Sequence, residues 1–144
     1  MRTYLDASVL VSMFSIDANS PRAQGLLASI DPDLSLSDWG VTEFSSALAV
    51  GMRVGRLTAA DRDAAEASLG SWLGANGLPE PVQPDDIRMG RSLIRATPLP
   101  LRASDALHLA VAQRLGDAVA TFDVQMARAA IDLGMPTADL SPHA

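Results

Sequence analysis

Short apolar segments with strand character alternate with helical segments along nearly the whole chain, and this alternation most limits the folds open to it. We expect strands at 3–5, 34–37, 80–83, 117–122 and 137–140. We expect helices at 7–15, 20–30, 38–55, 58–77, 85–95, 103–115 and 124–133. Strands that alternate with helices form parallel sheets covered on both faces. The sequence therefore predicts one α/β domain over residues 1–144, a length that can bury a core of its own.

Several predicted elements carry end signals. Asn19-Ser20-Pro21 indicates a helix start, with Ser20 as cap and Pro21 in the first turn, and Asp31-Pro32-Asp33 should stop that helix. The run from Thr58 to Asp61 resembles a capping box, and Gly77 should close the helix that follows. Prolines around 80–83 restrict this strand to a sheet edge.

Four carboxylates lie where an apolar run meets a helical segment. Asp6 in RTYLDAS and Asp123 in AVATFDVQM each follow a predicted strand. Glu43 in WGVTEFSSAL and Asp105 in RASDALHLAVA lie near helix starts, which face the same sheet edge if the crossovers are right-handed. Crowded carboxylates raise one another's pKa unless protons or a cation intervene, and their oxygens suit hard divalent ions. The sequence therefore predicts a metal-binding carboxylate pocket, which points to phosphodiester chemistry.

Each acid also has a purely structural interpretation. Asp6 and Asp123 can cap the helices that follow them, and Asp105 can be a favourable charge in a first helical turn. Glu43 lies in an apolar stretch, and Glu is rarely buried without a partner. Other acids, Asp86 among them, lie in polar turns or helix starts that need no special account. The joint position of the four is what favours a site.

Three further side chains lie close to these acids in sequence. Ser8 and Thr121 are each two residues from one of them and could bind a metal-bound water or a phosphate, although a cap or turn role is simpler. Arg102 precedes Asp105 by three residues and could hold a phosphate or remain solvated. We expect His108, on an apolar helix face, to be structural.

Composition narrows the classes of function. The net charge is −6 and every basic side chain is Arg, so tight nonspecific binding to nucleic acid is not expected. The four acids supply part of this charge, and two divalent cations would cancel their share. The chain has no Cys, which excludes disulfides and thiolate metal sites. No apolar run approaches the ~20 residues that cross a bilayer, and no signal pattern opens the chain, so we expect a soluble cytoplasmic protein without membrane association.

The acids and their contexts resemble those of PIN-domain ribonucleases, specifically VapC-type toxins of bacterial toxin–antitoxin pairs. The resemblance covers nearly the whole chain through YLDAS, the S-x5-E spacing from Ser37 to Glu43, LRASDALHLAVA and ATFDVQMARAAIDLGM, whereas 56–98 carries no diagnostic motif. By this resemblance the family's catalytic, metal-binding acids are Asp6, Glu43, Asp105 and Asp123, and its accessory hydroxyls are Ser8 and Thr121.

The resemblance implies a PIN-like α/β domain whose five-stranded parallel sheet has the order 3-2-1-4-5 and is flanked by helices. It also implies one or two Mg²⁺ or Mn²⁺ ions, an RNA substrate, a homodimer, and a cognate antitoxin that inserts a segment into the acidic groove. The expected activity is that of a metal-dependent endoribonuclease, the toxin of a type II toxin–antitoxin system. Metal-activated water would leave 5′-phosphate and 3′-hydroxyl ends.

Two other classes of function stay open. A catalytically silent PIN-like binding module would not need four intact acids. A metal-dependent phosphotransferase could use Asp6 as a nucleophile, but it would typically want a second acid two residues on, where this chain has Ser8. It would also want a Lys, which the chain lacks.

Overall fold

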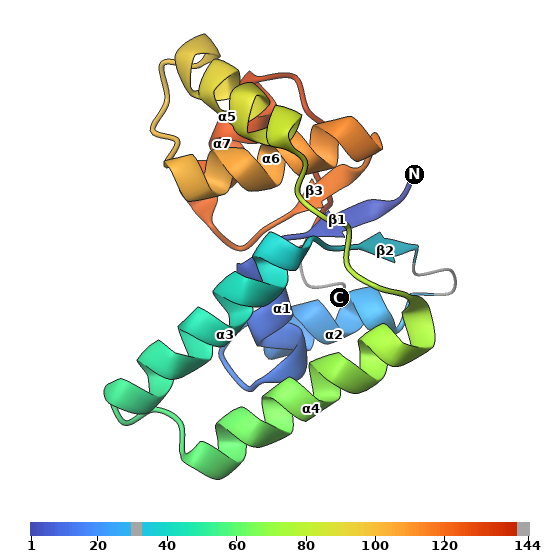
Figure 1. Ribbon diagram of the computed structural model, residues 1–144, viewed down its shortest axis with the longest axis vertical. Coiled ribbons are helices and arrows are strands. Elements are labelled where there is room, and N and C mark those ends of the chain that lie inside the picture. Colours follow the sequence, from blue (N-terminus) through green and yellow to red (C-terminus); the bar gives the residue numbers. More distant parts are fainter. Residues whose placement is uncertain (30–32, 141–144) are drawn as a thin grey trace.

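A small parallel sheet lies between two groups of helices (Figure 1). The structure, a computed structural model, describes residues 1–29 and 33–140. Its strands are β1 (Thr3–Leu5), β2 (Leu34–Ser35) and β3 (Ala118–Ala120). Its helices are α1 (Ala7–Phe14), α2 (Ser20–Leu27), α3 (Asp38–Arg53), α4 (Ala59–Asn76), α5 (Pro84–Ala96), α6 (Ala103–Leu115) and α7 (Val124–Asp132). In the described part of the chain no helix is both long and apolar enough to span a membrane.

The sheet has three parallel strands in the order β2-β1-β3, so the predicted five-stranded sheet of order 3-2-1-4-5 is wrong in its strand number. The predicted outer strands are reduced to single parallel bridges, between Ser37 and Glu80 beside β2 and between Val119 and Thr137 beside β3. Prolines explain the loss. Pro79 and Pro81 flank one bridge and Pro136 precedes the other, and proline has no N–H to extend a ladder.

The sheet joins two hydrophobic clusters because successive strand residues face opposite sides. Tyr4 and Val119 pack with the cluster of α5, α6 and α7. Their neighbours Leu5 and Ala120 pack with the cluster of α1 to α4. Each helical layer is therefore anchored on the same two adjacent strands, the central β1 and the outer β3, whose carboxyl ends lead directly into the predicted site.

Most helix ends follow the predicted signals. α6 occupies its predicted range and ends at Gly116, whose φ of 72° is the left-handed conformation that glycine adopts without strain. Thr58 and Asp61 form the predicted capping box of α4. α3 ends at Arg53, two residues earlier than predicted. α2 ends earlier than predicted, and the predicted stop signal at 31–32 lies outside the described residues.

Candidate functional site

Asp6 follows the central strand and is almost fully buried, with 4% of its surface exposed. Its backbone N–H donates to the Ala120 carbonyl at 3.2 Å, which fixes it beside the end of β3. Its Oδ1 accepts from the Val9 N–H at 3.1 Å, so Asp6 caps α1, as its structural interpretation predicted. Burial raises the pKa of Asp6, because the ionised carboxylate loses its hydration; hydrogen bonds from neighbouring hydroxyls offset part of the rise.

Two hydroxyls hold the Asp6 carboxylate. Ser8 Oγ donates to Asp6 Oδ1 at 2.6 Å, and Thr121 Oγ1 donates to Asp6 Oδ2 at 2.5 Å. Both hydroxyls also accept backbone N–H groups, Ser8 from Phe122 and Thr121 from Asp123, each at 3.0 Å. The two predicted accessory residues therefore tie the start of α1 to the loop after β3, with Asp6 at the junction.

Asp105 and Asp123 lie on either side of Arg102. Asp123 caps α7, its Oδ1 accepting from the N–H groups of Gln125 and Met126 at 2.9 and 3.1 Å. Arg102 Nη2 donates to Asp123 Oδ2 at 3.4 Å, and Arg102 Nε donates to Asp105 Oδ2 at 3.3 Å. Burial raises the pKa of Asp105; Arg102 opposes this rise and the negative charge of Asp123 adds to it. The guanidinium is thus the bridge between two predicted site acids.

Glu43 lies in the second turn of α3 and meets a residue that the sequence assigned to the core. Its Oε1 contacts Nε2 of His108, which is buried on α6. The His108 Nδ1 lies 2.8 Å from the Tyr4 hydroxyl, which lies 2.7 Å from Ser37 Oγ. His108 is structural, as predicted, but it also contacts a site acid. The sequence signals were a Glu in an apolar stretch without a local partner and a His one helical turn after Asp105.

Three of the four acids are linked to one another at the carboxyl edge of the sheet, whereas Glu43 is joined to His108 instead. Thr121 connects Asp6 with the backbone of Asp123, and Arg102 connects Asp123 with Asp105. Within residues 1–29 and 33–140, no three His, Asp or Glu side chains are placed to hold one metal ion as they stand. The predicted convergence of all four acids on one ion therefore stays a prediction.

Buried acids elsewhere in the chain make Asp6 stand out. Asp86, 2% exposed at the start of α5, accepts from Arg114 Nε at 2.8 Å and Nη2 at 3.0 Å. Asp117 accepts from Arg2 Nε at 3.1 Å. Among the described residues, no Arg forms such an ion pair with Asp6. A buried carboxylate normally requires a paired charge or a metal.

The donor chemistry of the site fits a divalent cation. Carboxylate oxygens, with hydroxyls beside them, are the ligands that Mg²⁺ and Mn²⁺ prefer. Burial raises the pKa of Asp6 and of Asp105 despite the hydroxyls beside Asp6 and the guanidinium beside Asp105, and a bound cation would oppose this rise. A cavity of about 280 Å³ between α1 and α3 borders this region, lined by Ala7, Ser8, Val11, Glu43, Ser46 and Ala47.

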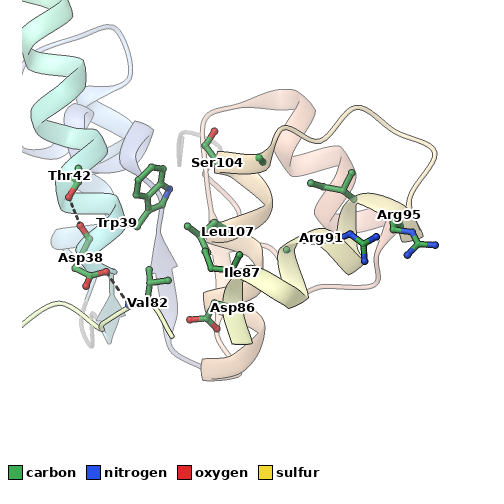
Figure 2. Close-up of a pocket in the computed structure, with 13 residues that line it drawn as sticks. Asp38, Trp39, Thr42, Val82, Asp86, Ile87, Arg91, Arg95, Ser104 and Leu107 are labelled. Carbon is green, nitrogen blue, oxygen red and sulfur yellow. Dashed lines mark hydrogen bonds between the residues drawn. The ribbon is translucent and has the colours of Figure 1, made fainter. Parts of the chain in front are cut away.

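A larger hollow lies beside these acids rather than at them. This groove of about 970 Å³ runs between the start of α3 and the pair α5–α6 (Figure 2). Trp39, Ile87 and Leu107 contribute apolar walls, while Thr42 and Ser104 are sequence neighbours of two site acids. None of the four acids lines it. The groove is therefore a surface separate from the four predicted site acids.

A three-layer α/β domain with carboxylates at the carboxyl edge of its parallel sheet is the class of protein that the fold and site define. The family model of the PIN domain matches residues 3–132, and the chain belongs to this family. The predicted PIN-domain resemblance is thereby confirmed. A search of curated proteins gave no match.

Solved structures share this fold. VapC20 from Mycobacterium tuberculosis, described as a sarcin–ricin loop cleaving toxin, is 23% identical with a TM-score of 0.70, over 88% of this chain and 94% of that one. FitAcB from Neisseria gonorrhoeae is 18% identical with a TM-score of 0.73, over 96% and 97%. FitAB bound to an IR36 DNA fragment is 19% identical with a TM-score of 0.70, over 96% and 94%.

Proposed function

We propose that this PIN-domain protein is a divalent-metal-dependent endoribonuclease that acts as the toxin of a type II toxin–antitoxin pair. The observation that carries the proposal is Asp6, a buried carboxylate at the end of the central strand, held by hydroxyls and a backbone N–H but by no arginine of the described chain. Its raised pKa marks a charge that a cation would compensate. The fold neighbour VapC20 is described as a sarcin–ricin loop cleaving toxin.

The side chains divide the work in this proposal. Asp6, Glu43, Asp105 and Asp123 would hold one or two Mg²⁺ or Mn²⁺ ions. A bound ion supplies an activated water at neutral pH and neutralises charge on the leaving oxygen. The three donors to Asp6 fix its carboxylate before any ligand arrives, which is the preorganisation that catalysis rewards. Products would carry 5′-phosphate and 3′-hydroxyl ends, and no protein nucleophile is required.

The same fixation argues against a phosphoaspartyl mechanism. Both Asp6 oxygens already accept hydrogen bonds, and the side chain is almost fully buried, so it is a poor nucleophile towards a phosphate. Trapping a phosphoaspartyl intermediate with labelled substrate would reverse this conclusion. A silent binding module would be favoured instead if Asp6→Asn left growth inhibition unchanged on expression.

Partners follow from the proposed role. We infer an RNA substrate, a cognate antitoxin that covers the acidic site, a cytoplasmic location and a homodimer. The groove supports the homodimer, because Ile87 in its wall is 58% exposed. In Figure 2 Asp38 lies at one end of the groove, and Arg91 and Arg95 lie at the opposite end. In a two-fold pairing the acidic end of one copy would face the basic end of the other.

RNA cleavage tests the proposed function. The wild-type chain should cut RNA with Mg²⁺ or Mn²⁺ and stop in EDTA, leaving 5′-phosphate ends. Asp6→Asn and Asp105→Asn should both abolish cleavage while circular dichroism shows an intact fold. Cyclic-phosphate ends, or full activity in EDTA, would overturn the metal mechanism, because a metal-free ribonuclease works through paired acid and base groups.

A further inference from the structure

We propose that Arg102 takes the place of a metal ion between Asp105 and Asp123, and that it withdraws to contact an RNA phosphate when a divalent cation binds. The inference rests on the proposed function and deepens it. Its starting point is the bridge itself: one guanidinium donates to Oδ2 of both acids, at 3.3 and 3.4 Å.

The bridge has the features of a contact that can open. The side chain of Arg102 is 74% exposed, whereas those of Asp105 and Asp123 are 15% and 29% exposed. Both distances exceed the ~2.7–2.9 Å of strong charge-assisted hydrogen bonds. Exposed ion pairs of this kind contribute little to stability and are readily exchanged for water. The carboxylates are therefore the fixed partners and the guanidinium the movable one.

Local structure allows Arg102 to leave without disturbing α6. Arg102 is the N-cap residue of that helix, with an extended backbone, and its side chain makes no cap hydrogen bond. Asp123 is oriented independently, through the two backbone N–H groups that bind its Oδ1. Withdrawal of Arg102 would thus leave Asp123 Oδ2 in place as an acceptor and would free Asp105 Oδ2.

A guanidinium and a divalent cation compete for these oxygens. Two positive charges held against the same atoms repel each other strongly at such short range. Once displaced, Arg102 would lie at the rim of the site, where a planar guanidinium suits the bidentate recognition of a phosphate. Two other arginines are held in ion pairs elsewhere: Arg2 pairs with Asp117 and Arg114 with Asp86.

The proposal predicts two effects of opposite sign in one variant. Removing Arg102 should tighten metal binding, because the competing cation is gone, and should weaken RNA binding, because the phosphate contact is gone. A residue that only supports the fold would not tighten metal binding when it is removed. Arg102 is therefore assigned as a positioning residue that also contacts substrate.

Calorimetry with Mn²⁺ and the 144-residue chain tests the first effect. Arg102→Gln should lower the Kd for Mn²⁺ about three- to tenfold, the size expected for losing two exposed ion pairs. Arg102→Lys, which keeps the charge, should stay within about twofold of the wild type. Arg53→Gln is the matched control, because it removes the same charge from the far end of α3, and it should leave the Kd unchanged.

Steady-state cleavage of an RNA oligonucleotide tests the second effect, with KM for Arg102→Gln rising about tenfold, as for loss of a phosphate contact. An unchanged or weaker Mn²⁺ affinity in Arg102→Gln, with native circular dichroism, would overturn the inference. Arg102→Ala replaces it if the Gln variant does not fold. A wild-type chain that binds no Mn²⁺ at all would refute the proposed function itself, so the two failures are distinguishable.

Discussion

The imidazole of His108 contacts the carboxylate of Glu43 although 65 positions separate them in sequence. Ser37 Oγ accepts from the Gly40 N–H, so its own hydrogen can be donated to Tyr4. The Tyr4 hydroxyl can then donate to His108 Nδ1, which leaves the Nε2–H to donate to Glu43. In that arrangement every polar group in this buried series of hydrogen bonds has a partner. The buried residues thereby fix the orientation of the Glu43 carboxylate.

Removal of His108 should therefore weaken the site. We expect His108→Ala to lower metal-dependent RNA cleavage about tenfold or more, the usual effect of losing a residue that orients a metal-ligand carboxylate. Cleavage rates and Mn²⁺ titrations measure this. Tyr4→Phe is the matched control: it breaks the same chain one bond further from Glu43, so stability should fall by about 1 kcal/mol while activity changes less. Wild-type cleavage by His108→Ala would contradict the assignment.

The ionised Asp105 side chain should destabilise the metal-free protein. Its raised pKa, due first to burial, means that the ionised form is disfavoured in the fold. Asp105→Asn should therefore raise the thermal midpoint of the metal-free protein by about 3 °C at neutral pH while abolishing cleavage. Asp61→Asn is the control of opposite sign, because hydrogen bonds to the backbone and hydroxyl of Thr58 lower the pKa of Asp61. Asp61→Asn should lower the thermal midpoint. A lower midpoint in both Asp61→Asn and Asp105→Asn would contradict this interpretation of Asp105.

Acid should weaken metal binding. The raised pKa values of Asp6 and Asp105 let protons compete with the ion at a higher pH than at ordinary carboxylates. In the metal-free protein, the stability that these groups contribute is fully present below their unfolded pKa and is lost as pH rises through the higher folded pKa. Saturating Mn²⁺ should reverse that trend. Thermal midpoints measured between about pH 4 and pH 7, with and without Mn²⁺, test this reversal. Identical pH profiles in the two conditions would contradict the prediction.

The ion pair of Asp86 and Arg114 should stabilise the fold far from the site acids. Burial alone would raise the pKa of Asp86, but hydrogen bonds from Arg114 and the Gln83 N–H outweigh it and the pKa is lowered. The stability that Asp86 contributes is thus present above its unfolded pKa and lost as pH falls through the folded one. Arg114→Ala leaves the buried Asp86 carboxylate without its cation. It should lower the free energy of unfolding, measured in urea, by about 3 kcal/mol.

Arg88→Ala provides the comparison for that measurement. Arg88 pairs with Asp85 on the same helix, but both side chains are largely exposed. Arg88→Ala should therefore lower the free energy of unfolding by no more than about 0.5 kcal/mol. Equal decreases in the free energy of unfolding for Arg114→Ala and Arg88→Ala would show that burial does not determine the strength of these ion pairs. The sequence placed Asp86 correctly at a helix start but gave no sign of its burial, because Arg114 lies 28 positions away.

Local patterns predicted what depends on neighbouring residues. The α6 range, the capping box at Thr58 and the caps at Asp6 and Asp123 all follow from short-range hydrogen bonding. The contact of His108 with Glu43 depends on how α3 packs against α6. Because α6 is buried on most of its surface, one His among its apolar residues resembles an ordinary core position. The bridge from Arg102 to Asp123 was equally hidden, since 21 positions separate them.

The groove beside α5 should determine assembly. We expect the chain to be a dimer in analytical ultracentrifugation, with Ile87→Asp converting it to monomers, because a charge in the apolar wall would be buried without a partner. Ile16→Asp, at an even more exposed apolar residue between α1 and α2, should leave the dimer intact. Raised salt should weaken the dimer as well, since Asp38 of one copy would face Arg91 and Arg95 of the other. A monomeric wild type, or a dimer that survives Ile87→Asp and high salt, would place the second copy elsewhere.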